Sequence, residues 1–301
     1  MRALVISGGG SKGAFAGGVA QFLIEELKRD YQLYLGTSTG SLLVSHLALN
    51  KIEKIKEVYT SVDNDSIFSL CPFVIKEKYG TQNISIHHFN VLRNFLRGSK
   101  TFGESYSLKN LIQDTFTEDE FKKLKKSAYD IVVTVANLSL NQVEYKSIHD
   151  FDYEDFCEWI WISCNFTPFM TLAKKNFCEY ADGGLGSMVP IEEAIKRGAT
   201  EIDAIILQTE ISQLNRMPSK NAFSLLSSMF NFMLDRIENQ NIRIGKFVAS
   251  HQDIIINFYY TPTVLTTNSL IFNKEKMTRW WESGYQFAKF KNEDLSQLEI
   301  L

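Results

Sequence analysis

Short apolar runs alternate with segments of helical spacing along the first part of the chain. Residues 3–7, 31–35 and 129–137 are apolar runs rich in β-forming residues, and they predict buried strands. Residues 14–29 repeat apolar side chains every three or four positions, and residues 42–49 form an apolar stretch without Gly or Pro. Both segments predict helices. Because a helix follows each early strand, this order predicts an α/β domain with parallel strands.

Strand and helix patterns continue through the rest of the chain. Further strands are predicted at residues 142–148, 177–180, 202–208 and 253–260, and helices at residues 51–59, 89–95, 107–116, 191–197, 223–237 and 276–290. Residues 61–88 mix Asn, Asp, Pro and Gly with scattered aromatics, which predicts a cap or loop region instead of core strands. Residues 212–222 also predict a loop.

Two of the predicted helices leave a choice between core and surface roles. The helix at 223–237 places five apolar side chains on one face, those of Leu226, Met229, Phe230, Met233 and Ile237. That spacing favours core packing over a helix lying in a membrane interface. The basic cluster at 121–126, beside Phe121 and Leu124, is typical of a solvated helix end, with contact to anionic headgroups as the alternative.

Composition narrows the choice of partners and compartment. The chain has 301 residues, 45% of them hydrophobic, so we expect residues 1–301 to form a single domain. With 32 Lys and Arg against 35 Asp and Glu, its formal charge of -3 does not favour nucleic acid as a partner. The four cysteines lack C-x-x-C spacing, which indicates free thiols in a reducing compartment.

No targeting or membrane-spanning pattern is visible in the sequence. The N-terminus has no secretory apolar region of the usual length, and no window has the ~18 uninterrupted apolar residues of a membrane span. We therefore expect a cytoplasmic protein that contacts lipid from the membrane surface, in peripheral association.

The sharpest motif is the pentapeptide at residues 36–40, between a predicted strand and a predicted helix. Gly36 and Gly40 flank Ser38 in a G-x-S-x-G arrangement. Such a turn holds the serine in a strained conformation with its hydroxyl standing clear at the strand end. The glycines are required where strand and helix backbones approach closely. The pentapeptide by itself is a weak signal, because a Gly turn of this kind can be purely structural.

A Gly-rich loop follows the first strand and contains Gly8, Gly9, Gly10 and Gly13. Its G-x-G-x-x-G spacing fits a dinucleotide-binding fingerprint, with Asp30 near the distance expected for a ribose contact. Asp30, however, precedes the second strand, whereas the ribose-binding acid should follow it. The alternative use of such a loop is an oxyanion hole, in which several backbone N–H groups converge on one developing negative charge. A P-loop is excluded, since Ala, not Lys, follows the last glycine.

A third Gly-containing turn follows the predicted strand at 177–180. Asp182 precedes Gly183 and Gly184, so its carboxylate lies in a tight turn, either as a plain Asx turn or as a positioned base. His87 and His88 have no Cys or carboxylate nearby to complete metal-ligand spacing. We therefore expect neither a metal nor a cofactor.

The three Gly motifs together resemble the patatin-like phospholipase family. The loop at 7–13, the elbow at 36–40 and Asp182-Gly183-Gly184 occur in the order and context of that family, and the resemblance covers residues 1–208. Residues 209–301 form a less recognisable extension. The resemblance implies a three-layer α/β/α sandwich with a mostly parallel central sheet. It also implies a phospholipase A-type lipid acyl hydrolase that cleaves phospholipid esters through a Ser-Asp dyad and an acyl-serine intermediate.

The resemblance also assigns roles to residues by position. Ser38 corresponds to the nucleophile, Asp182 to the general base, and the backbone of Gly8, Gly9 and Gly10 to the oxyanion hole. The remaining motif residues would support this geometry; they are Lys12, Gly13, Gly36, Gly40, Gly183 and Gly184. The sequence departs from the family at Lys12, where many members have Arg, and at residues 164–166, where small residues usually precede the Pro. The second departure bears on the acyl pocket and substrate preference.

Two alternatives remain open at this point. One is a Ser-His-Asp esterase or acyltransferase that uses one of the five histidines, His46, His87, His88, His149 or His251. His251 is the best placed of these in chain order. The other is a non-catalytic lipid- or dinucleotide-binding domain whose motifs only hold backbone geometry. The sequence does not indicate the oligomeric state.

Overall fold

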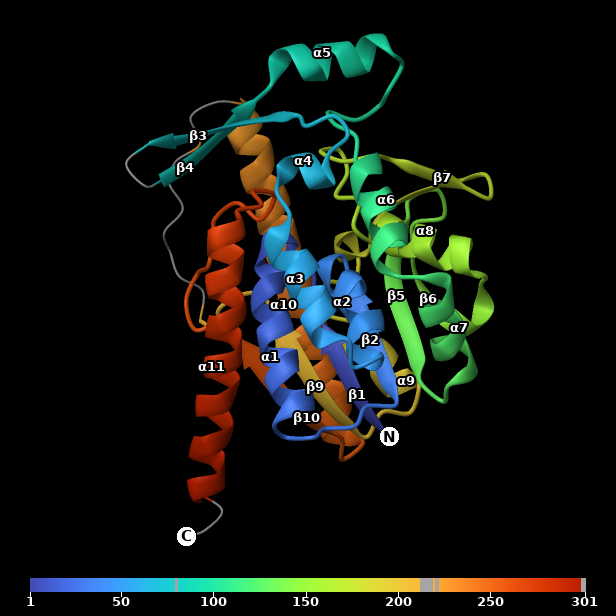
Figure 1. The fold of residues 1–301 in the computed structure, drawn as a ribbon, viewed down its shortest axis with the longest axis vertical. Helices are drawn as coiled ribbons and strands as arrows, with labels where there is room; N and C mark the ends of the chain where they lie inside the picture. Colours follow the sequence, from blue (N-terminus) through green and yellow to red (C-terminus); the bar gives the residue numbers. More distant parts are fainter. Residues whose placement is uncertain (79–80, 212–218, 220–221, 299–301) are drawn as a thin grey trace.

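A mixed, mostly parallel sheet forms the centre of the molecule (Figure 1). The computed structural model describes residues 1–78, 81–211, 219 and 222–298. The strands of the main sheet are, in spatial order, β10 (Ile255–Tyr260), β9 (Glu201–Ile206), β1 (Arg2–Ile6), β2 (Leu33–Thr37), β5 (Asp130–Asn137), β8 (Cys178–Asp182) and β7 (Ala173–Lys175), with β6 (Gln142–Ser147) paired to β5. The first five run parallel to their neighbours, and β6, β7 and β8 pair antiparallel.

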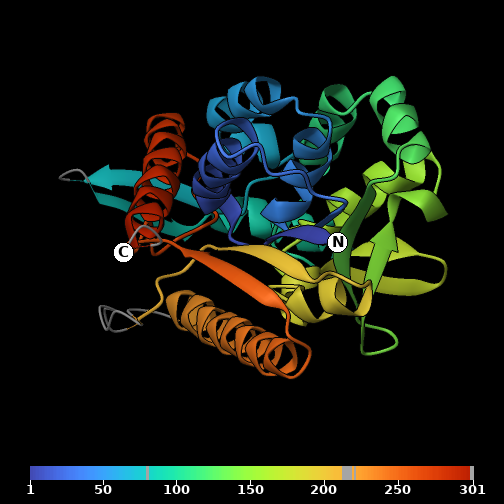
Figure 2. The ribbon, with the colours of Figure 1, turned by 90° about the horizontal axis from the view of Figure 1, so that it is seen from below.

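Helices cover both faces of this sheet, which makes the α/β/α sandwich expected from the sequence. The helices are α1 (Gly13–Glu25), α2 (Thr39–Ala48), α3 (Ile52–Ser61), α4 (Asn64–Ile67), α5 (His88–Leu96), α6 (Tyr106–Thr115), α7 (Glu118–Lys126), α8 (Tyr153–Ser163), α9 (Ile191–Lys196), α10 (Ala222–His251) and α11 (Lys274–Leu298). Figure 2 shows α9 and α10 on one side of the sheet and α1, α3 and α11 on the other. Each face has its own cluster of buried apolar side chains.

The closing helix α11 packs directly on α1. A Cβ atom added at Gly17 would lie 2.2 Å from the ring of Trp281, and one added at Gly18 would lie 1.9 Å from the Trp281 carbonyl oxygen. Trp281 is fully buried, and its indole N–H donates to Gln21 Oε1 at 2.8 Å. The glycines of α1 therefore allow the last helix of the chain to approach the first one closely.

Most strands and helices lie close to where the sequence predicts them, but α8 and β7 were not predicted, and two predictions need correction. Residues 61–88 form more than a cap or loop, since they contain α4 and an antiparallel hairpin of β3 (Phe73–Lys78) and β4 (Thr81–Ile86) outside the main sheet. α10 is twice the predicted length, and its predicted core face is only partly buried, because Met229 and Met233 are exposed. The loop predicted at 212–222 lies largely outside the described residues.

Within the described ranges, no helix combines the length and apolar content needed to cross a bilayer.

Candidate active site

The turn at residues 36–40 has the geometry of a strained nucleophile elbow. β2 ends at Thr37, α2 begins at Thr39, and Ser38 between them has φ 52° and ψ -120°. A Cβ atom at Gly36 would lie 2.4 Å from the Gly40 carbonyl carbon, and one at Gly40 would lie 2.4 Å from the Ile6 carbonyl oxygen. Only glycine fits at either position, so the two glycines are what allows β1, β2 and α2 to converge on Ser38.

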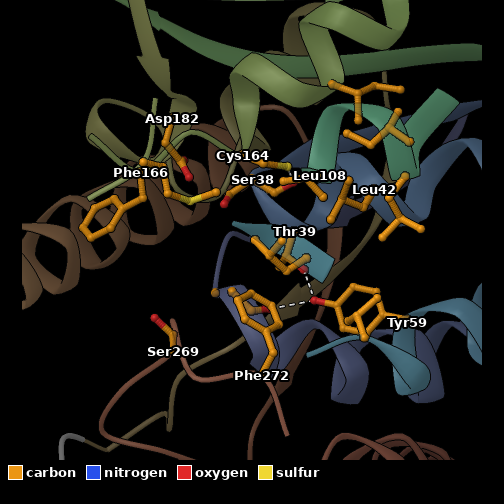
Figure 3. A pocket seen from close by; sticks show the side chains of 18 of the residues that line it. Ser38, Thr39, Leu42, Tyr59, Leu108, Cys164, Phe166, Asp182, Ser269 and Phe272 are labelled. Carbon is orange, nitrogen blue, oxygen red and sulfur yellow. Dashed lines mark hydrogen bonds between the residues drawn. The ribbon is translucent and has the colours of Figure 1, made fainter. Parts of the chain in front are cut away.

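Asp182 faces Ser38 from the end of β8. β8 pairs antiparallel with β5, with Val135 opposite Asp182, and this places the carboxyl group beside the elbow. The Asp182 carboxyl group faces the Ser38 hydroxyl, which acts to lower its pKa, and the Gly184 N–H donates to its Oδ1 at 2.7 Å. Figure 3 shows the two side-chain oxygens pointing toward one another. The structure thus brings together the serine and the carboxylate that the sequence singled out.

The environment of Asp182 makes it a stronger base than an ordinary carboxylate. The residue is 4% exposed, and burial raises its pKa from 3.8 to about 7, although the neighbouring Ser38 hydroxyl and the Gly184 N–H act in the opposite direction. A carboxyl group with this pKa exchanges its proton near neutral pH. The arrangement can therefore accept the hydroxyl proton of Ser38 when the serine attacks.

The Gly-rich loop lies beside this pair, but only some of its glycine N–H groups are free to donate to a ligand. The Gly8 N–H donates to the Met188 carbonyl oxygen at 3.2 Å, so the expectation that Gly8 supplies a free oxyanion donor is wrong for this structure. Gly9 and Gly10 line the same pocket as Ser38, and in the described part of the chain neither amide has an acceptor. Two N–H groups, those of Gly9 and Gly10, therefore remain available to an oxyanion.

The Gly10–Ser11 peptide is clamped on both sides. Tyr59 of α3 donates its hydroxyl proton to the Gly10 carbonyl oxygen at 2.7 Å, and the Ser11 N–H donates to the Ser269 carbonyl oxygen at 2.9 Å. Gly10 has φ 56°, and a Cβ atom there would lie 2.3 Å from the Ser269 oxygen. The Tyr59 hydroxyl also bonds Thr39, the residue after Ser38. These contacts fix the position of the Gly-rich loop relative to the turn at Ser38.

Lys12 lies beneath the loop and not in the pocket. Its ammonium donates to the Leu207 carbonyl oxygen at 2.5 Å, and Leu207 packs against the Gly9 backbone. Burial lowers the pKa of Lys12, and the carboxylate of Glu238 partly opposes that shift. Gly13 is equally structural, since a Cβ atom there would lie 2.2 Å from Thr39 Oγ1. Gly183 abuts β5 in the same way, with Thr134 O 2.2 Å from its added Cβ.

Ser163 and Cys164 support the elbow in a way that the sequence did not indicate. The Ser38 N–H donates to Ser163 Oγ at 3.0 Å, and Ser163 Oγ lies 2.8 Å from the hydroxyl of Ser41. The Cys164 thiol donates to the Ser38 carbonyl oxygen at 3.1 Å. Both residues stand at the end of α8, 125 positions or more along the chain from Ser38, so no local pattern could have linked them to it.

An apolar pocket opens from the Ser38 side chain. Its polar end contains Ser38, Asp182, Gly9 and Gly10, and Phe166 and Met188 lie beside them. The rest is lined by apolar side chains from α2, α3, α6 and the segment before α11, among them Leu42, Ile55, Leu108, Ile112, Phe116 and Phe272. Figure 3 labels Leu42, Leu108 and Phe272 of this group. This shape suits a ligand with a reactive polar group at one end and a long apolar chain.

The structure does not support a Ser-His-Asp arrangement among the described residues. His251 is exposed at the end of α10, where its Nδ1 lies 2.8 Å from the Phe247 carbonyl oxygen. His46 lines the pocket, but it is eight residues after Ser38 on α2, about 12 Å along the helix axis. Its ring meets Phe116 edge-on at 5.8 Å, and burial lowers its pKa.

The dinucleotide alternative fails on the position of Asp30. β1 and β2 are parallel, with Ala3 opposite Leu33, so the Gly-rich loop lies at the carboxyl edge of the sheet. Asp30 precedes β2 and lies at the amino edge, where it accepts from the Gln32 amide at 3.2 Å. A ribose bound at the loop would be on the other edge from this carboxylate.

Comparisons with known proteins identify similar chains. The family model described as Patatin-like phospholipase matches residues 4–195 of this chain. Among solved structures, VipD from Legionella pneumophila is similar in fold, with 14% sequence identity and a TM-score of 0.49. That match covers 96% of this chain and 66% of the VipD chain, so this chain spans just under two thirds of VipD's length. No curated protein matches the sequence.

Proposed function

Because the chain belongs to the patatin-like phospholipase family, whose members act on lipid esters, we propose that it is a phospholipase A-type acyl hydrolase with Ser38 as its nucleophile and Asp182 as its base. One observation carries this proposal above the others. The hydroxyl of a strained serine faces a buried carboxyl group with a raised pKa at the polar end of an apolar pocket (Figure 3). The acyl chain of a phospholipid would occupy the pocket, with its ester carbonyl at Ser38.

The first half of the proposed reaction forms an acyl-serine. Ser38 Oγ attacks the ester carbonyl carbon while its proton passes to the Asp182 carboxylate. The negative charge that develops on the carbonyl oxygen is stabilised by the N–H groups of Gly9 and Gly10, which Tyr59 and Ser269 hold in place. Collapse of the tetrahedral intermediate expels the lysolipid alkoxide, which takes the proton from Asp182. The products of this half are an acyl-serine and a lysolipid.

The second half returns the enzyme to its starting state. A water molecule attacks the acyl-serine carbonyl, and Asp182 accepts the proton of that water. Collapse of the second intermediate releases the fatty acid and returns a proton to Ser38 Oγ. Asp182 serves both halves because its pKa of about 7 allows it to accept and release a proton near neutral pH.

Fatty-acid release from mixed phospholipid vesicles tests this proposal. We expect wild type to release fatty acid and lysolipid, measured by mass spectrometry, and Ser38→Ala to release neither while it keeps the wild-type circular dichroism spectrum. The products would also identify the head group and the ester position. Near-normal release by a folded Ser38→Ala variant would overturn the assignment of the nucleophile.

A further inference from the structure

α5 exposes a row of large apolar side chains to solvent. Phe89 is 70% exposed and Leu96 is 80% exposed, and Leu92 and Phe95 are exposed beside them. Only Val91 and Asn94 of this helix are buried. A helix that exposes this much apolar surface to water is typical of a site that binds an apolar surface or a lipid layer.

The first half of α10 exposes a second apolar group. Leu225, Met229, Phe232 and Met233 are all at least half exposed. Residues 222–234 of α10 contain no charged side chain. Asn231 and Leu234 of the same turns line the pocket that opens at Ser38, so this apolar surface borders the pocket itself. We call the exposed apolar side chains of α5 and of residues 225–233 together the apolar rim.

A continuous row of aromatic rings connects the two parts of the apolar rim through the pocket wall. Phe95 of α5 contacts Phe102 with ring centroids 5.9 Å apart, and Phe102 contacts Phe169 at 5.8 Å. Phe169 stacks on Phe166 at 5.6 Å, and Phe166 lines the pocket and meets Phe230 of α10 at 5.7 Å. Figure 1 places α5 and the first turns of α10 at the same end of the molecule, beyond the carboxyl ends of the parallel strands.

The charge around α5 is one-sided in a chain whose formal charge is -3. Residues 78–103 contain two Lys and two Arg and no Asp or Glu. In the described part of the chain, neither Arg93 nor Arg97 pairs with a carboxylate. Arg97, Lys100 and Lys174 line a second, polar cleft at the end of α5; Glu104 also lines it, and Lys100 pairs with Glu179. Cations of this kind beside an apolar helix complement anionic headgroups above an acyl layer.

We propose that the apolar rim docks on a lipid surface that carries anionic headgroups, with Arg93 and Arg97 at the headgroup level. This inference rests on the proposed function, because it names the surface through which the acyl hydrolase reaches its substrate. Docking there places the pocket opening against the acyl layer. A phospholipid then moves from bilayer to Ser38 along apolar side chains without exposing its acyl chain to water.

Vesicle binding tests the docking without requiring hydrolysis. In the Ser38→Ala background, flotation with phosphatidylcholine vesicles containing phosphatidylglycerol is compared for the parent and for Phe89→Ser/Leu92→Ser/Leu96→Ser. We expect the triple variant to bind at least about tenfold more weakly, because three apolar side chains no longer enter the acyl layer. Arg93→Gln/Arg97→Gln should bind the anionic vesicles about tenfold more weakly than the parent, with little change in binding to phosphatidylcholine alone.

Leu27→Ser and Lys28→Gln are the matched controls, since both residues are exposed near the amino end of β2, away from α5. Both should bind within twofold of the parent. Melting by circular dichroism checks that every variant is folded. Unchanged binding by the triple variant, or a parent that does not bind anionic vesicles at all, would overturn the proposal. A dimeric parent that becomes monomeric in the triple variant would also overturn it, because the apolar rim would then be an interface between two copies.

Wild-type activity separates this inference from the proposed function. In the wild-type background, the triple substitution should lower the rate of fatty-acid release from vesicles by about tenfold or more. It should leave the rate of hydrolysis of a monomeric short-chain ester unchanged. Vesicle binding without any fatty-acid release by wild type would contradict the proposed function and leave the docking surface intact. Release from vesicles that the triple substitution does not change would contradict the docking surface alone.

Discussion

Two buried aspartates at opposite edges of the sheet show how burial can produce different roles. Asp203 of β9 is fully buried near the amino ends of the strands, where it pairs with Arg29 and accepts from Tyr31 at 2.7 Å and from Asn257 at 2.8 Å. Asp182 is almost as buried at the other edge. In the described ranges no Lys or Arg pairs with it; it accepts from the Gly184 amide and faces the Ser38 hydroxyl (Figure 3).

The difference between the two sites is the charge that compensates the carboxylate. A buried carboxylate with a guanidinium beside it forms an ion pair that holds elements together. A buried carboxylate without a cation has a raised pKa and accepts protons near neutral pH, which is the property that a general base requires. Burial alone therefore does not identify a functional group, whereas burial without a compensating charge, beside a strained serine, marks a candidate base.

The largest contrast is expected from Asp182→Asn and Asp203→Asn. We expect Asp182→Asn to lower turnover by at least about 10³-fold, because the base is lost. Asp203→Asn should keep the turnover of the folded protein within about threefold, and it should lower the free energy of unfolding by on the order of 2–4 kcal/mol because Arg29 is left unpaired. Steady-state hydrolysis and urea denaturation measure the two effects. Equal losses of turnover in both variants would contradict the different roles inferred for Asp182 and Asp203.

The pH dependence sharpens the same comparison. Turnover should fall about tenfold per pH unit below about 7, as Asp182 takes up a proton. The folded state keeps that proton from pH 3.8 up to about 7 while the unfolded chain releases it, so stability falls as the pH rises through this window.

Removing the titrating group should therefore reverse that loss of stability. Asp182→Asn should be more stable than wild type at pH 8, by on the order of 2–4 kcal/mol. It should have no such advantage at pH 3.5, where the side chain at position 182 is neutral in both proteins. Thermal melts at the two pH values measure this. A variant with the same advantage at both pH values would contradict the raised pKa.

A smaller effect is expected at the apolar end of the pocket. Ile112 of α6 is buried and lines the pocket, so Ile112→Phe should shorten the space for the acyl chain. We expect the ratio of rates on long-chain and short-chain esters to fall about tenfold, with the short-chain rate nearly unchanged. Ile244→Phe is the control, since Ile244 is exposed on α10. An unchanged chain-length preference would show that acyl chains do not occupy this space.

The elements that carry the site could be predicted because their signals are local. Gly36 and Gly40 around Ser38 define a turn that only glycine permits, and the strand predicted at 177–180 corresponds to β8, which ends at Asp182. Such patterns depend on the backbone of neighbouring residues, which the sequence displays directly. The order of strands and helices predicted the layered fold for the same reason.

The parts that were missed depend on contacts between distant segments. The donor role expected of the Gly8 amide is excluded by Met188, and the Ser38 amide is held by Ser163; neither partner is near in sequence. The helical spacing of Met229 and Met233 resembles that of a core face, yet Met229 is 55% and Met233 50% exposed. Periodicity shows that a helix has an apolar side but not what that side meets.

Covalent labelling with a fluorophosphonate tests the central claim, the Ser38–Asp182 pair, most directly. The probe reacts with an activated serine, and peptide mass spectrometry locates the adduct. We expect Ser38 to be the modified residue in wild type, labelling to slow as the pH falls below about 7, and Asp182→Asn to slow it by at least about 10²-fold. An adduct on another serine, or equally fast labelling of Ser38 in Asp182→Asn, would contradict it.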